Sequence, residues 1–183
     1  TWHRERDLAW CESFHRPIVL LEKKESHREG CRSLAFGIAP KNQYLGIMLP
    51  YTPLHYRLLE TGPELLVMTS GNRSGEPLSI ENDDALDAFS HIADYFLFHN
   101  RDIYFRADDS IMQYQGGDPR FFRRSRGYAP LPILLKKTVP QVLACGAGLK
   151  STVCLTKEDR AFLSQHIGDL DDHKTFEFYK QSV

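Results

Sequence analysis

The chain has 183 residues, enough for one ordinary domain or for one domain and a piece of a second. Its 23 lysine and arginine residues almost balance its 24 aspartate and glutamate residues, so the overall charge indicates neither a nucleic acid nor an anionic membrane as partner. No apolar run approaches the roughly 20 residues that span a bilayer. The charged, aromatic start does not resemble a signal peptide. These features predict a cytoplasmic protein in which anion binding is local.

The four cysteines, Cys11, Cys31, Cys145 and Cys154, are scattered along the chain and form no C-x-x-C pair. This spacing suits reduced thiols better than a disulfide framework or a zinc site. The sequence also lacks an initiator methionine and stops inside an apparently helical stretch. We therefore expect a piece of a longer chain.

In chain order, short apolar runs alternate with helical stretches, which is typical of an α/β fold. Runs rich in branched and aromatic residues predict buried strands at residues 18–21, 45–49, 65–69 and 95–99. Two further strands are predicted at residues 110–114 and 120–124.

Two helices are predicted between these strands. Thr52 followed by Pro53 is an N-cap followed by the helical position that accepts proline, which predicts a helix through residue 60. Apolar residues at three- and four-residue steps predict a second helix over residues 83–93, and the aspartates at its start favour that end.

Pro130, Pro132 and Pro140 fall within eleven residues and would interrupt any regular element there. Residues 130–140 are therefore predicted to be a linker between domains. Beyond it, the sequence predicts a strand, a glycine turn and a second strand over residues 141–156, then a third strand and a loop from residue 160.

A final helix is predicted at residues 171–180. Strand, glycine loop, strand is how actin-like and sugar-kinase-like (ASKHA) ATP domains begin. Since such a fold needs far more chain than remains, residues 141–183 are expected to be only its start.

Four stretches of the sequence are rich in polar residues that could bind a ligand. The first two lie at a predicted helix start and after a predicted strand. In residues 46–55 a strand runs into the capped helix, whose free N–H groups could face a phosphate; the favoured alternative is that Thr52 only caps and His55 only packs. Residues 69–77 place hydroxyls, an amide and glycines after a predicted strand, which suits a ligand loop and a plain turn equally. The spacing is not that of a P-loop, and lysine is absent.

The other two stretches are rich in arginine. In residues 99–110, Arg101 and Arg106 could neutralise phosphate while Asp108 or Asp109 holds a second arginine or a magnesium ion; the alternative is a solvated turn. Residues 120–128 contain four arginines in seven positions, a pattern suited to bidentate phosphate binding or purine stacking. Basic strands with aromatic residues can also bind RNA or simply form a solvated edge.

Five runs, MLPYTPLH, VMTSGN, FLFHNRDI, RADDSI and RRSRGYAP, occur in an order that resembles the YrdC-like domain of the HypF family of hydrogenase maturation carbamoyltransferases. LACGAGLKSTVCL and LSQHIGDL resemble the start of that family's final domain. The resemblance extends over nearly the whole chain from about Pro17. It implies a partial YrdC-like nucleotide-binding domain at residues 1–129, built on an α+β twisted mixed sheet, and the N-terminal part of a carbamoyl-transferring ASKHA-like domain at residues 141–183.

The resemblance also implies a reaction. Carbamate released from carbamoyl phosphate would be joined to ATP, with Mg²⁺, as carbamoyl adenylate, and the carbamoyl group would pass to the C-terminal cysteine of HypE for the cyanide ligand of [NiFe]-hydrogenase. Adenylate formation requires anions to be positioned and needs no covalent nucleophile. No catalytic residue is therefore assigned in this chain.

By resemblance, a nucleotide and carbamoyl-adenylate site is expected at Thr69, Ser70, Asn72, Arg101, Arg106, Ser110, Arg124 and Arg126. The first three would hold phosphates or the carbamoyl group, the next two would neutralise charge, Ser110 would touch phosphate, and the last two would clamp the adenylate. Zinc and a second metal are expected only in parts of the full-length protein outside this chain, so the isolated chain should bind nucleotide weakly and be inactive.

Two alternatives of other classes remain. A YrdC-type threonylcarbamoyl-adenylate synthase for tRNA modification is disfavoured by the extension containing GAGLKST and QHIGDL. A non-catalytic RNA-binding module is disfavoured by the near-neutral charge.

Overall fold

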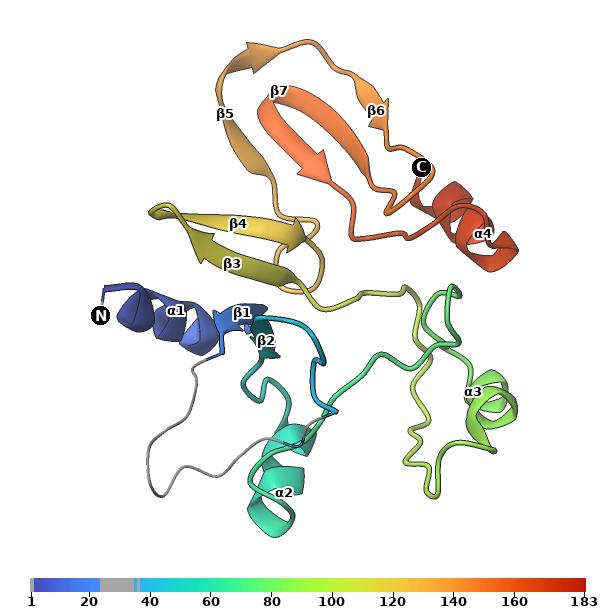
Figure 1. Ribbon diagram of the computed structural model, residues 1–183. Coiled ribbons are helices and arrows are strands. Elements are labelled where there is room, and N and C mark those ends of the chain that lie inside the picture. Colours follow the sequence, from blue (N-terminus) through green and yellow to red (C-terminus); the bar gives the residue numbers. More distant parts are fainter. Residues whose placement is uncertain (1, 24–34, 36) are drawn as a thin grey trace. The chain divides into compact units, whose positions relative to one another are not determined.

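The computed structural model describes residues 2–23, 35 and 37–183. The chain forms two compact units. The first unit comprises Thr1–Leu65 and Asp109–Gly127, and the second comprises Leu66–Asp108 and Tyr128–Val183. Figure 1 shows the elements of both. Of the four cysteines that were predicted to be reduced thiols, Cys11, Cys145 and Cys154 are free thiols. Cys31 lies outside the described residues.

A four-stranded mixed sheet organises the first unit, in the order β2-β1-β3-β4. β1 (Ile18–Glu22) pairs antiparallel with β2 (Tyr44–Ile47) and parallel with β3 (Ile111–Gln115), and β3 pairs antiparallel with β4 (Asp118–Arg123). The strands predicted for these segments are thereby confirmed. The sequence did not indicate that β1 and β3 are neighbours.

The core of the first unit lies between this sheet and the helix α1 (Trp2–Glu12). Cys11, Val19 and Met112 form it, each at most 3% exposed. Burial raises the pKa of the Cys11 thiol, so this residue packs as a small apolar side chain.

Helix α2 (Pro53–Thr61) begins as predicted. Thr52 Oγ1 accepts a hydrogen bond from the backbone N–H of His55 at 3.2 Å, which satisfies one of the free donors of the first turn. The His55 ring packs edge-on to Tyr51, with ring centroids 4.6 Å apart. The structure thus shows the capping and packing roles that were the favoured alternative for these two residues.

Gly127 makes a close approach to the chain near His15. Its φ is +86°, its carbonyl accepts a hydrogen bond from Nδ1 of His15, and a Cβ added to it would lie 2.8 Å from the His15 carbonyl oxygen. Gly117 also has a positive φ, +98°, but has open space around it. The backbone strain is shared by both positions, and the clash belongs to Gly127 alone.

We therefore expect Gly127→Ala to destabilise the protein by roughly 1–3 kcal/mol, because alanine adds both left-handed strain and a backbone clash. Thermal unfolding measures the loss. Gly117→Ala is the matched control, since it introduces strain without the clash, and an equal loss from both substitutions would contradict the role assigned to the His15 contact.

In the second unit, β5 (Ile133–Val139), β7 (Val153–Leu163) and β6 (Leu143–Cys145) form an antiparallel sheet in that order. The unit also contains α3 (Asn82–Phe89) and α4 (His173–Ser182). Its core consists of Val153, Ile167 and Phe178, with Leu170 and Tyr179 packed against it. Both predicted helices are confirmed, although α3 ends four residues earlier than the predicted residue 93.

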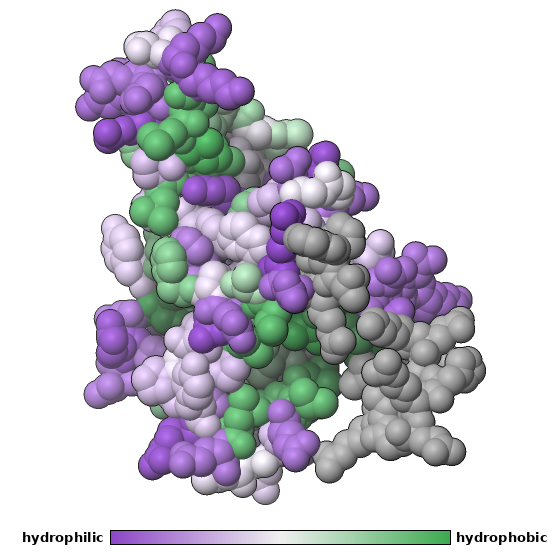
Figure 2. Space-filling view, turned by 90° about the vertical axis from the view of Figure 1, so that its left-hand side faces the viewer, coloured by the Kyte–Doolittle hydropathy of each residue, from purple (hydrophilic) through white to green (hydrophobic). Residues whose placement is uncertain are grey.

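Two strand predictions are wrong. Residues 65–69 and 95–99 belong to no strand of the described chain, and Leu65 and Val67 are each 74% exposed. Their apolar composition suits a strand, but a strand also needs a hydrogen-bonded neighbour, which composition cannot reveal. Apolar side chains accordingly lie open on the surface as well as in the two cores, and the face in Figure 2 carries several such patches among hydrophilic ones.

Two further corrections concern residues 130–163. The prediction that the prolines interrupt every regular element is wrong, because β5 occupies the proline-free interval between Pro132 and Pro140. The predicted third strand is not separate, since β7 runs unbroken through the charged residues 157–160 by pairing first with β6 and then with β5. The domain boundaries at residues 129 and 141 stay a prediction.

Among the described residues, no helix is long and apolar enough to cross a membrane.

Candidate functional site

The predicted site residues fall into both compact units. Ser110, Arg124 and Arg126 belong to the first unit, and the others, Thr69, Ser70, Asn72, Arg101 and Arg106, belong to the second. Each unit therefore holds its own group of predicted site residues.

In the first unit, the guanidinium of Arg126 lies at the centre of a polar cluster. Its Nε donates to Oδ1 of Asp109 at 2.5 Å, and its terminal nitrogens donate to the carbonyls of His15 at 3.2 Å and Arg16 at 2.8 Å. The Arg126 and Asp109 side chains are only 21% and 28% exposed. The expectation that Asp108 or Asp109 holds a second arginine is confirmed for Asp109. Charge-assisted bonds in such shielded surroundings hold the guanidinium in one orientation.

Tyr51 forms one wall of this cluster. The Arg126 guanidinium carbon lies 3.6 Å from the centre of the Tyr51 ring, a cation–π contact. Burial raises the pKa of the Tyr51 hydroxyl, as does the nearby Asp109 carboxylate, while Arg126 opposes them. The hydroxyl is therefore protonated at neutral pH. Tyr51 lies in the polar stretch at residues 46–55 but was not predicted as a site residue, because only its contact with an arginine distant in sequence distinguishes it.

Ser110 connects β3 to the arginine-rich segment. Its fully buried Oγ donates to the Arg126 carbonyl and accepts from the Ser125 N–H, both at 2.8 Å. Ser110 therefore orients the backbone that carries Arg126, and its contact with phosphate stays a prediction. Arg124 is partly buried two residues before Arg126.

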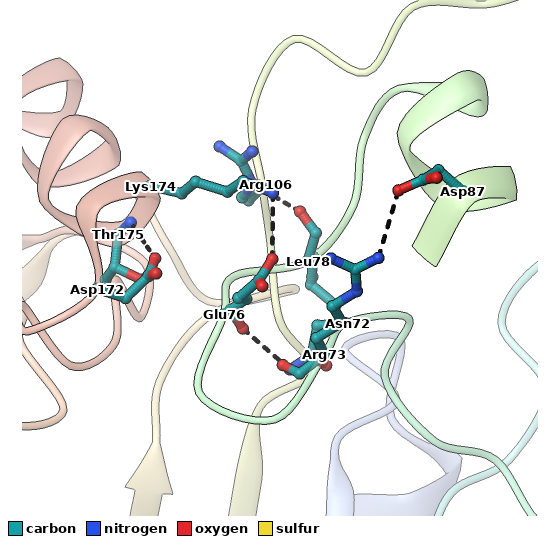
Figure 3. Close-up of polar contacts among 9 residues, drawn as sticks. All are labelled: Asn72, Arg73, Glu76, Leu78, Asp87, Arg106, Asp172, Lys174 and Thr175. Atoms are coloured by element: carbon teal, nitrogen blue, oxygen red, sulfur yellow. Dashed lines mark hydrogen bonds and ion pairs between the residues drawn. The ribbon is translucent and has the colours of Figure 1, made fainter. Parts of the chain in front are cut away.

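In the second unit, residues 70–79 form a loop that Asn72 closes upon itself (Figure 3). The Asn72 side-chain nitrogen donates to the carbonyls of Arg73 at 3.0 Å and Glu76 at 2.9 Å. The Ser79 N–H donates to the Gly71 carbonyl at 2.9 Å. Thr69 and Ser70 are exposed at the start of this loop. The amide of Asn72 thus organises the loop on which the predicted phosphate ligands lie.

Arg106 contacts the same loop, since its Nε donates to the Leu78 carbonyl at 2.7 Å. Arg101 lies elsewhere, at a surface hollow of about 440 Å³ that is also lined by His99, Asp102 and Ile103. The structure therefore brings Arg106 to the loop of Asn72, whereas Arg101 lines the surface hollow. Within the described residues, no cluster of three or more histidine, cysteine, aspartate or glutamate side chains could hold a metal ion.

Comparisons with known proteins divide the chain in two. The family model of Sua5, YciO and YrdC proteins, described as "Telomere recombination", matches residues 2–125, and the model of the HypF Kae1-like domain matches residues 137–183. Carbamoyltransferase HypF of Synechocystis sp. is 44% identical over 97% of the chain and 23% of its own length. Carbamoyltransferase HypF2 of Cupriavidus necator is 45% identical over 97% of the chain and 24% of its own length.

A crystal structure of full-length HypF in the phosphate- and nucleotide-bound form superimposes with a TM-score of 0.85 at 49% identity, covering 97% of this chain and 27% of that one. The chain belongs to the HypF family. Its α/β fold is that of a YrdC-like domain followed by the start of a HypF Kae1-like domain, which confirms the predicted fold class. The chain spans about a quarter of the length of the HypF relatives that it matches.

Proposed function

We propose that this chain contributes the nucleotide-binding part of an ATP-dependent carbamoyltransferase of the HypF type. The observation that carries the proposal is the match over 97% of the chain to a HypF whose structure is in a phosphate- and nucleotide-bound form. The joint presence of YrdC-like and HypF Kae1-like segments in one chain favours this function over a threonylcarbamoyl-adenylate synthase.

The proposed reaction joins carbamate, obtained from carbamoyl phosphate, to ATP. A carboxylate oxygen of carbamate forms a bond to the α-phosphorus, the bond from this phosphorus to the β-bridging oxygen breaks, and pyrophosphate leaves with the electron pair. The carbamate oxygen carries no proton, so no general base is required. The need is for cations and donors that offset charge developing on phosphate oxygens.

The guanidinium groups of Arg124 and Arg126 suit this need, as does the protonated hydroxyl of Tyr51. Arg126 is already oriented by Asp109 and by two carbonyls, so little ordering is left for ligand binding. In the second unit, Thr69, Ser70, Arg101 and Arg106 supply further donors that suit phosphate, and Asn72 shapes the loop. Mg²⁺ would arrive with the phosphates, since it is usually held by substrate and only one or two carboxylates.

The later step is part of the same proposal. The carbamoyl group would pass to the C-terminal cysteine of the HypE protein, in the cytoplasm, with the segment matched to the Kae1-like domain contributing to the transferring domain. Zinc and a second metal would belong to other parts of the full natural protein.

ATP–pyrophosphate exchange by the full natural protein tests the proposal. We expect exchange that depends on carbamoyl phosphate and is absent with threonine plus bicarbonate; the isolated 183-residue chain serves as the inactive control. Exchange driven by threonine and bicarbonate instead would overturn the proposal in favour of the tRNA-modifying enzyme. Strongly salt-dependent RNA binding without any exchange would favour the RNA-binding alternative.

A further inference from the structure

Within the second unit, helix α4 contacts the loop formed by residues 70–79 (Figure 3). Nζ of Lys174, in the first turn of α4, lies 3.1 Å from Oε2 of Glu76 in the loop. The Lys174 side chain is 55% exposed and that of Glu76 is 29% exposed. This ion pair joins the segment matched to the Kae1-like domain with the segment matched to YrdC proteins.

The position of Lys174 is unusual for a cation. The first turn of a helix carries free N–H groups and a partial positive charge, which disfavour lysine. Asp172 satisfies one of these free N–H groups at the cap, since its carboxylate accepts a hydrogen bond from the Thr175 N–H at 2.9 Å. Lys174 instead directs its ammonium group to Glu76 across the loop, so its favourable interaction comes from the loop and not from the helix.

A second attachment of the loop to α4 runs through Arg106. The Arg106 guanidinium lies 5.4 Å from the centre of the Phe178 ring while its Nε donates to the Leu78 carbonyl at 2.7 Å. The neighbouring Phe105 ring packs against Phe178 with centroids 5.0 Å apart. Phe178 is only 2% exposed and belongs to the core of the unit, so this attachment is rooted in well-packed structure.

The two attachments hold loop positions that hydrogen bonds within the loop also restrain. The Glu76 carbonyl accepts from the Asn72 side chain, and Leu78 precedes Ser79, whose N–H closes the loop onto Gly71. A shift of α4 would therefore move Glu76 and Leu78, and with them the backbone that follows Thr69 and Ser70.

We propose that α4 sets the conformation of the 70–79 loop, and that Glu76, Lys174 and Phe178 are positioning residues for the nucleotide bound there. The nucleotide at this loop rests on the function proposed above; the control of the loop by α4 does not. The consequence is a mechanical link by which the segment matched to the Kae1-like domain adjusts nucleotide affinity in the YrdC-like segment.

Charge reversal in the full natural protein tests the link. Lys174→Glu places like charges together, so we expect faster amide hydrogen exchange in the 70–79 loop without nucleotide and a Kd for ATP that is about two- to fivefold higher, with kcat at saturating ATP unchanged. Glu76→Lys combined with Lys174→Glu restores an opposite-charge pair and should return both measurements towards those of the unmodified protein.

Lys180→Glu is the matched control, because Lys180 lies on the same helix, is 53% exposed, and pairs with Glu177 of α4 itself at 2.5 Å. The link is overturned if Lys174→Glu leaves loop exchange equal to that of the Lys180 variant, or if the double variant fails to restore it. Altered exchange with unaltered ATP affinity would overturn the positioning role. If the unmodified protein binds no ATP, the proposed function fails, while the exchange measurement still decides whether α4 controls the loop.

Discussion

Replacing Phe178 by alanine is expected to destabilise the second unit by about 3–5 kcal/mol, the range for truncating a buried phenylalanine. The ring is 2% exposed and packs with Val153 and Ile167, which come from β7 and from the loop that follows it. Truncation removes apolar burial and leaves a cavity, and it also removes the surface on which Phe105 and Arg106 rest. Urea denaturation followed by circular dichroism measures the loss.

Phe176→Ala is the matched control for this prediction. Phe176 has the same side chain on the same helix but is 43% exposed, so its truncation should cost at most about 1 kcal/mol. Equal losses from the two substitutions would show that Phe178 does not anchor the core. Phe178→Leu keeps most of the buried area and should fall between them.

Replacing Arg126 by alanine is expected to cost roughly 2–4 kcal/mol in the first unit. The substitution leaves the Asp109 carboxylate, which is 28% exposed, without its arginine, and it removes the donors to the carbonyls of His15 and Arg16. The Tyr51 ring also loses the cation above it. Thermal unfolding of the unmodified and substituted proteins measures the effect.

Arg126→Lys separates charge from geometry. Lysine keeps the positive charge beside Asp109 but cannot bond the carboxylate and both carbonyls at once, because it lacks the planar fork. We expect it to recover part of the stability lost with alanine, and to bind nucleotide less tightly than arginine. A stability change below about 0.5 kcal/mol for Arg126→Ala, the range of ordinary surface substitutions, would contradict the central role of this guanidinium.

Local signals in the sequence predicted α2, α3 and α4, whereas α1 was not predicted. The hydrogen bond from His55 N–H to Thr52 spans three residues, as does the one from Thr175 N–H to Asp172, so the residues that start each helix are neighbours in the chain. Strands were predicted where apolar composition and sequential pairing agree, as for β3 and β4. Residues 65–69 have the same composition without a partner strand among the described residues, and residues 133–139 have a partner that the flanking prolines concealed.

The candidate site residues likewise show some features that the sequence predicts and others that only the tertiary structure reveals. Residue types were sufficient to indicate anion binding, because guanidinium groups, hydroxyls and glycine loops are recognisable in the sequence itself. The order of the motifs was sufficient to indicate the HypF family. Which arginine is oriented, and by what, was decided by the tertiary structure: Arg126 takes its partners from the segments that hold Tyr51 and Asp109. The ion pair of Glu76 with Lys174 likewise joins residues 98 positions apart. Capping depends on neighbours along the chain, whereas strand pairing, arginine clusters and the link to α4 depend on groups that only folding brings within hydrogen-bonding distance.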